Sequence, residues 1–211
     1  MSRVTAKICG LSTPETLDAA IAGGASHVGL MFFAPSPRNL SFDTAANLAV
    51  RVPDRVSRVG VFVDPDDTLL EAAIAAGKLD AVQLHNTTPA RAAAIRERIP
   101  VWVAIAVKTR ADLDSAINYR DAADHILFDA KTPDDATRPG GMGIRFDWSL
   151  LDGFRHPLPW ALSGGLTPEN VADAAARTGA TLVDASSGLE SAPGVKDVDK
   201  IAAFLKAVAQ C

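Results

Sequence analysis

Reactive side chains close several short aliphatic segments of this chain. Cys9, His85 and Asp129 each stand at the last position of such a segment. A thiol there can be a nucleophile or a base, although a lone cysteine is often a small buried hydrophobe. A histidine can equally be a core residue, and an aspartate can be a turn or helix cap. Because all three residues stand at the same end of their segments, a shared functional site is favoured over these separate structural explanations.

The alternation of side chains along these segments adds further polar residues. Lys7 shares a face with Cys9, and Asp184 shares a face with Ser186. A polar row is unusual on a strand that should be buried, so these side chains are expected to face a site. Lys7 can also be explained as a salt-bridge partner.

Two glycine-containing turns suggest a phosphate site. Backbone N–H groups approach an anion closely only where side chains are absent, and a helix N-terminus adds to the attraction. Ordinary strand-to-helix turns have similar sequences, and one such turn alone is a weak signal. The expected phosphate-binding residues are Gly164, Gly165, Ser186, Ser187 and Gly188.

The loop at 32–38 ends on an arginine. Pro35 and Pro37 restrict its backbone, and Arg38 follows directly. A guanidinium group suits bidentate binding of a carboxylate. Taken alone, however, the segment is better explained as a surface arginine in a proline-rich turn.

The elements that must position these residues alternate along the whole chain. Apolar segments predict eight strands, at 4–9, 27–33, 58–64, 80–85, 101–108, 125–129, 160–163 and 181–186. Alanine-rich segments predict helices at 14–22, 43–50, 66–77, 89–98, 111–116, 168–178 and 198–209. Thr13, Thr88 and Thr167 each precede a proline and are expected to cap the helices that follow.

Strands that alternate with helices form parallel sheets with right-handed crossovers. Eight units in 211 residues average about 26 residues each, which leaves no room for a second domain. An open sheet should carry a GxGxxG fingerprint after its first strand, and the chain reads CGLSTPE there. We therefore expect a single α/β domain over 1–211, an eight-stranded (β/α)₈ TIM barrel. Its active site should lie at the carboxyl ends of the strands.

Composition excludes several partners. With 21 basic and 25 acidic residues, the net charge of −4 provides no basic surface for nucleic acid. No apolar run reaches the roughly 20 residues of a membrane span, and the start lacks a signal peptide, so we expect a cytoplasmic protein with no membrane partner. Cys9 and Cys211 form no disulfide framework. No cluster has the spacing of metal ligands.

Eight motifs, in one order along nearly the whole chain, resemble those of the phosphoribosylanthranilate isomerase family. They are KICG (7–10), SPR (36–38), VGVFV (59–63), QLH (83–85), FDA (128–130), GG-x-G-x-x-FDW (140–148), LSGGL-x-P-x-NV (162–171) and VDASSGLE followed by G-x-KD (183–197). This family has a (β/α)₈ barrel and acts in tryptophan biosynthesis. Its reaction is an Amadori rearrangement of a phosphorylated aminoaldose to an aminoketose, without a redox change, so the resemblance implies no metal or other cofactor.

The resemblance implies a role for each candidate. Cys9 would be the general base, with a pKa lowered below the free value of about 8.5 with help from Lys7. Asp129 would be the general acid, with a pKa raised by burial or by a negative neighbour such as the thiolate. Arg38 would bind the anthranilate carboxylate, and the glycine turns would hold the phosphate.

The resemblance also implies three further assignments. Asp184 would touch the sugar hydroxyls or orient the phosphate loop, and His85 would line the site without transferring protons. The irregular stretch 131–145 would be a flap over the small phosphosugar substrate. The family includes monomers and homodimers, so either state is open.

The chain departs from the family pattern at three positions. Asn86 stands where glycine is common, Met142 where threonine is common, and Asp64 follows VGVFV where asparagine is common nearby. None of these is the proposed acid or base. The alternatives are a ribulose-phosphate epimerase, an indoleglycerol-phosphate synthase, or a barrel that binds the ligand without turnover. The epimerase would need metal ligands that the four histidines do not supply, because His27 and His125 lie at strand starts.

Overall fold

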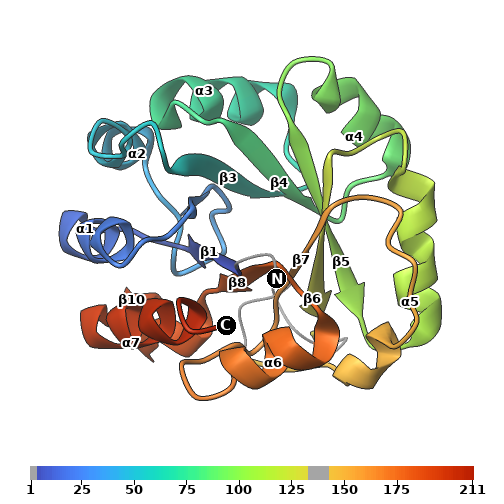
Figure 1. The fold of residues 1–211 in the computed structure, drawn as a ribbon. Helices are drawn as coiled ribbons and strands as arrows, with labels where there is room; N and C mark the ends of the chain where they lie inside the picture. The colour runs from blue at the N-terminus through green and yellow to red at the C-terminus, as the bar shows by residue number, and fades with distance from the viewer. Residues whose placement is uncertain (1–3, 133–142) are drawn as a thin grey trace.

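The computed structural model describes residues 4–132 and 143–211. Eight parallel strands close a barrel in chain order, with the helices outside the ring (Figure 1). The strands are β1 (Thr5–Cys9), β2 (His27–Met31), β3 (Ser57–Val63), β4 (Ala81–His85), β5 (Val101–Val107), β6 (His125–Ala130), β7 (Trp160–Leu162) and β8 (Leu182–Ala185). The predicted (β/α)₈ barrel is confirmed.

Seven α-helices and three 3₁₀ turns lie between or after the strands in the described part of the chain. The helices are α1 (Pro14–Ala22), α2 (Phe42–Ala49), α3 (Asp67–Gly77), α4 (Pro89–Arg96), α5 (Arg110–Asp114), α6 (Val171–Thr178) and α7 (Val198–Val208). The 3₁₀ turns are η1 (Ser115–Tyr119), η2 (Trp148–Leu151) and η3 (Ser187–Leu189).

Threonine caps start two of the helices as predicted. Thr13 accepts a hydrogen bond from the Thr16 backbone at 3.3 Å, and Thr88 accepts one from the Arg91 backbone at 3.3 Å. These bonds satisfy N–H groups that have no partner within the first helical turn.

The prediction that Thr167 caps a helix at 168–178 is wrong. Helix α6 begins at Val171, because the Asn170 side chain ties the preceding residues into a turn. Its Oδ1 accepts from the Thr167 backbone at 2.9 Å, and its Nδ2 donates to the Gly165 carbonyl at 2.9 Å. An asparagine side chain competes well for local backbone groups in this way.

A short antiparallel hairpin, β9 (Glu190–Ala192) and β10 (Val195–Lys196), follows β8 and was not predicted. Strands of three and two residues carry no periodic signal. The turn between them contains Gly194, whose φ of +82° is one that glycine adopts without strain. This hairpin brings two charged residues to the rim of the barrel.

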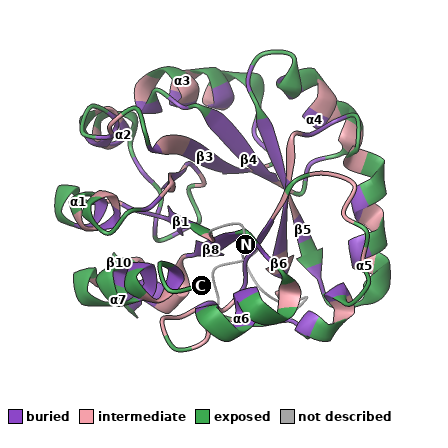
Figure 2. Ribbon diagram, in the orientation of Figure 1, coloured by how far each residue is buried: buried purple, intermediate pink, exposed green. Residues whose placement is uncertain are grey.

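The barrel is filled by side chains. Figure 2 shows the strands mostly buried and the outer faces of the helices exposed. Toward the amino ends of the strands, the rings of His27 and His125 pack on Trp102, with centroids 5.1 and 4.5 Å away. Both histidines begin their strands, as predicted, and so lie at the end opposite Cys9. No helix in the described ranges is long and apolar enough to cross a membrane.

Candidate active site

A single cavity at the carboxyl ends of the strands collects ten of the eleven predicted site residues. Its lining also includes apolar side chains from β2 and β3, such as Met31 and Val61. The predicted residues in the lining are Cys9, Arg38, His85, Asp129, Gly164, Gly165, Asp184, Ser186, Ser187 and Gly188. The eleventh, Lys7, is fully buried beside them.

Lys7 is held by an ion pair across the closure of the barrel. The pairing of β1 with β8 places it opposite Asp184, and its Nζ donates to Asp184 Oδ1 at 2.8 Å. Ser163 Oγ donates to the other carboxylate oxygen at 2.9 Å. Although burial alone would lower the pKa of Lys7, the charges of Asp184 and Cys9 raise it, so the amine stays protonated.

Asp184 is therefore bound on both carboxylate oxygens by protein groups. The sequence analysis assigned it to sugar hydroxyls or to the phosphate loop. In the structure, its direct partners are Lys7 on β1 and Ser163 at the end of β7. The sequence analysis quoted Ser163 only within the motif at 162–171, and its hydroxyl holds this carboxylate.

The expectation that the pKa of Cys9 is lowered is wrong. Burial raises the pKa of the thiol, and the opposing charge of Lys7 does not compensate. The reason is that the Lys7 charge is already neutralised by Asp184, whose own charge raises the pKa of the thiol further. Cys9 is therefore mainly a protonated thiol at neutral pH.

Asp129 has the opposite tuning from an ordinary aspartate. Burial, and then the charge of Asp184, raise its pKa from 3.8 to about 7. The Ala130 backbone donates to its Oδ1 at 2.9 Å. The raised value agrees with the expectation, but the negative neighbour is Asp184 rather than a Cys9 thiolate.

His85 lies against Gln83, which comes from the same strand and was given no role from the sequence. Their Nε2 atoms are 3.0 Å apart. Burial and then the charge of Lys7 lower the pKa of His85 to about 4, so the ring is neutral at physiological pH. Gln83 Oε1 is buried without a protein partner in the described residues, and Gln83 is among the residues that line the cavity.

The glycines of the two turns have a packing reason as well as an electrostatic one. A Cβ on Gly188 would lie 2.1 Å from the Leu166 carbonyl oxygen, and one on Gly164 would lie 2.8 Å from the Ala130 nitrogen. Gly164 also has a φ of +91°. The turns after β7 and β8 therefore press against neighbouring backbone where only glycine fits, and both turns line the cavity.

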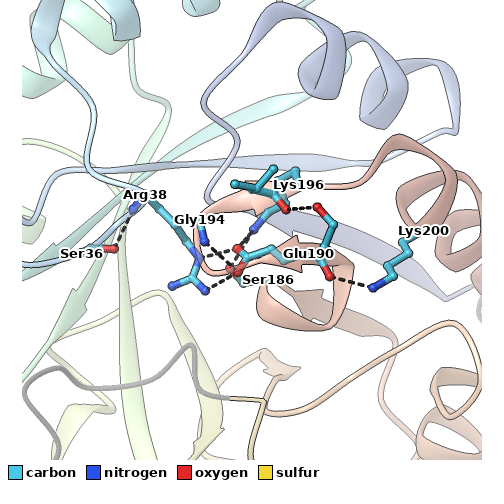
Figure 3. Close-up of polar contacts among 9 residues, drawn as sticks. Ser36, Arg38, Ser186, Glu190, Gly194, Lys196 and Lys200 are labelled. Atoms are coloured by element: carbon cyan, nitrogen blue, oxygen red, sulfur yellow. Dashed lines mark hydrogen bonds and ion pairs between the residues drawn. The ribbon is translucent and has the colours of Figure 1, made fainter.

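Arg38 is not a surface arginine, since only 3% of it is exposed. Glu190 on β9 and, through it, Lys196 on β10 hold the guanidinium at the cavity wall (Figure 3). The sequence analysis quoted both residues within motifs but gave neither a role. Nothing in the spacing of Arg38 and Glu190, which are 152 residues apart, could have paired them.

Two of the departures from the family pattern have a backbone explanation. Asn86 has a φ of +55° and Asp64 a φ of +43°, both in the left-handed region. Asparagine and aspartate adopt this region more readily than other side chains, so Asn86 can replace a glycine here. Met142 and most of the expected flap at 131–145 lie outside the described residues.

Sequence comparison identifies relatives that match this chain over almost its whole length. A family model for N-(5'-phosphoribosyl)anthranilate (PRA) isomerase matches residues 6–207. The enzyme of that name from Zymomonas mobilis subsp. pomaceae is 53% identical over 209 residues, which cover 97% of this chain and 98% of the relative. That from Paramagnetospirillum magneticum is 52% identical over 207 residues, covering 97% and 96%.

Solved structures agree. The Thermotoga maritima phosphoribosyl anthranilate isomerase superposes with a TM-score of 0.88 at 38% identity, covering 99% of this chain and all of that one. A phosphoribosyl anthranilate isomerase in complex with reduced 1-(o-carboxyphenylamino)-1-deoxyribulose 5-phosphate superposes with a TM-score of 0.86 at 36% identity, with the same coverage. The family model, the sequence identities and the shared barrel together show that this chain belongs to the N-(5'-phosphoribosyl)anthranilate isomerase family.

Proposed function

We propose that Cys9 and Asp129 are the base and the acid of the isomerisation that this family catalyses in tryptophan biosynthesis. The activity is that of an aldose–ketose isomerase, in which an aminoaldose becomes an aminoketose. The observation that carries the assignment is the pair of groups on one cavity, one of which is a carboxyl group with a pKa of about 7.

Asp129 is suited to open the sugar ring. A carboxyl group with a pKa near 7 is protonated often enough to give its proton to the furanose oxygen at physiological pH. The C1–O bond then breaks as the anthranilate nitrogen donates its lone pair, which leaves a protonated Schiff base and the Asp129 carboxylate. Burial disfavours the carboxylate and raises the pKa of Asp129, so a larger fraction of the side chain is protonated when substrate binds.

Cys9 is suited to remove the proton from C2 of the Schiff base. A raised pKa makes the thiolate scarce but also a stronger base, so each thiolate abstracts a carbon-bound proton more readily. Loss of the C2 proton gives an enolamine. The product forms when C1 gains a proton from the Cys9 thiol and the C2 hydroxyl gives one to the Asp129 carboxylate, so both groups return to their starting states and the reaction has no net change in protons.

The two ends of the substrate require two anion sites, and the cavity wall offers both. We assign the carboxylate to Arg38 and the phosphate to the backbone of the turns after β7 and β8. The bound molecule in the related complex carries both a carboxyphenyl group and a 5-phosphate, which supports this arrangement. Lys7 and Asp184 form the ion pair whose charges act on the acid and the base. His85 lines the wall of the cavity as a neutral ring.

We also propose that the chain works as a single cytoplasmic barrel domain, either as a monomer or as a homodimer. The Thermotoga maritima relative is described as dimeric, and monomers of it have been generated. Light scattering on the purified protein at several concentrations distinguishes the two states.

The roles of Cys9 and Asp129 are tested by conservative variants in the presence of a chelator. Cys9→Ala and Asp129→Asn should each lower kcat by roughly two to four orders of magnitude. Binding of the reduced product should change little, because neither side chain is assigned to an anionic end. Near-normal kcat in either variant would remove that residue from its role.

A further inference from the structure

Glu190 lies directly behind Arg38 and outside the cavity lining. Its carboxylate accepts from Arg38 Nε at 2.6 Å and from Arg38 Nη2 at 2.8 Å (Figure 3). The side chains of both residues are almost fully buried, with 3% and 5% exposed. A bidentate pair of this kind fixes both the position and the plane of a guanidinium.

The pair uses one edge of the guanidinium, which limits how Arg38 can meet a ligand. Glu190 occupies the edge formed by Nε and Nη2. The position and plane set by Glu190 therefore decide which way the rest of the guanidinium faces.

Glu190 is itself held in place from three sides. Lys196 Nζ donates to Oε1, and the Gly194 backbone donates to Oε2 at 3.1 Å. Lys200 Nζ donates to the Glu190 carbonyl at 2.7 Å. Lys196 also donates to Ser186 Oγ at 3.3 Å, which links the carboxylate site to the turn after β8.

The stem of Arg38 is confined as closely as its head. A Cβ on Gly10 would lie 2.6 Å from Arg38 Cδ, and a Cβ on Gly194 would lie 2.7 Å from the Pro37 carbonyl oxygen. The β1 end and the hairpin tip thus pack against the Arg38 loop where only glycine fits. Two buried cations share one carboxylate here, so the cluster has a net positive charge beside the cavity.

We propose that Glu190 is a positioning residue that aims Arg38 and thereby sets the preference of the site for a substrate with an aromatic carboxylate. Lys196 supports this role by holding Glu190 ionised and by joining it to the phosphate turn. The proposal rests on the assignment of the substrate carboxylate to Arg38. It adds that selectivity depends on a side chain that does not touch the substrate.

The test compares two probes on the full-length protein by calorimetry. One probe is reduced 1-(o-carboxyphenylamino)-1-deoxyribulose 5-phosphate, and the other is the same molecule with phenyl in place of carboxyphenyl. The Kd of the phenyl probe divided by the Kd of the carboxyphenyl probe measures selectivity for the carboxylate without any turnover. In Glu190→Gln, loss of the shared charge should lower this ratio by about tenfold and raise KM while kcat changes little.

Two further variants keep the test decisive. Glu190→Asp retains the charge but shortens the reach, so it should recover part of the ratio, and it replaces Glu190→Gln if that variant does not fold. Asp18→Asn breaks an exposed bidentate pair with Arg51 and is the matched control, with an unchanged ratio.

The outcomes separate this inference from the assignment on which it rests. If the wild type binds both probes equally, Arg38 is not the carboxylate site and both ideas are overturned. If the wild type discriminates between the probes and Arg38→Met does not, the assignment of the carboxylate to Arg38 is retained. If both Glu190 variants then keep the full ratio, the positioning role of Glu190 is wrong.

Discussion

Asp184 sits across the β1–β8 pairing from Lys7, and its carboxylate accepts the Lys7 ammonium at 2.8 Å. This ion pair couples the two residues assigned to catalysis. The Lys7 charge lowers the pKa of Cys9, while the Asp184 charge raises the pKa values of both Cys9 and Asp129. The pair lies where β1 and β8 close the barrel, and its charges act on the pKa values of the acid and the base together with burial, which is the largest cause of both shifts.

The coupling predicts a particular pH profile. The active form needs a protonated Asp129, with a pKa of about 7, and a deprotonated Cys9, with a pKa above the ordinary thiol value. This active form and the dominant form, an Asp129 carboxylate with a Cys9 thiol, each hold one proton, so the ratio of the two does not change with pH. Consequently kcat/KM should rise through pH 7, level off, and fall only when Cys9 titrates.

Asp184→Asn tests this interpretation. Removal of its negative charge should lower the pKa of Asp129 and move the acid limb of kcat/KM to lower pH. It should also destabilise the fold by roughly 3–5 kcal/mol, because Lys7 is left buried without its counter-ion. Asp80→Asn, which breaks the ion pair with Arg58 before β4, is the control and should leave the limb in place. An unmoved limb in Asp184→Asn would assign it to another group.

A second prediction concerns the Cys9 thiol itself. In a Cys211→Ser background, ultraviolet absorbance of the thiolate should titrate above the ordinary thiol pKa, because burial disfavours the charged form. Lys7→Met should move the midpoint higher still, since the Lys7 charge opposes that shift. Lys206→Met, on the exposed side of α7, should have no effect. A midpoint below the ordinary value would mean that Lys7 outweighs burial.

The sequence predicted the parts of this site that depend on local pattern. Aliphatic runs placed the eight strands to within about two residues, and parallel strands bring their carboxyl ends together. Cys9 and Asp129 could therefore be expected on one cavity although they lie far apart in the chain.

What could not be predicted depends on contacts between distant residues. Closure of the barrel pairs Lys7 with Asp184 across 177 positions, and the hairpin brings Glu190 to Arg38. The pKa of Cys9 follows from a balance between burial and a lysine that is already neutralised, which sequence spacing does not show. Even a local feature, the start of α6, was decided by the Asn170 side chain rather than by the more familiar threonine cap.

The raised pKa of Asp129 also predicts an effect on stability. Its folded-state pKa of about 7 lies above the ordinary value near 3.8, so the stabilising protonated form is fully present below pH 4 and is lost as the pH rises through 7. Asp129→Asn removes this loss, and the amide oxygen can still accept from the Ala130 backbone.

Urea unfolding of this variant and the wild type checks the prediction at two pH values. The gain in free energy of unfolding should be near zero at about pH 4 and about 2 kcal/mol at about pH 8, which allows for partial exposure of the carboxylate. Asp18→Asn should show no such gain, because Arg51 lowers the pKa of Asp18. An equal gain for Asp129→Asn at both pH values would show that packing, and not the buried charge, causes it. A gain confined to high pH, together with a loss of kcat, would mean that the same buried carboxyl group serves as the acid and lowers the stability of the fold at high pH.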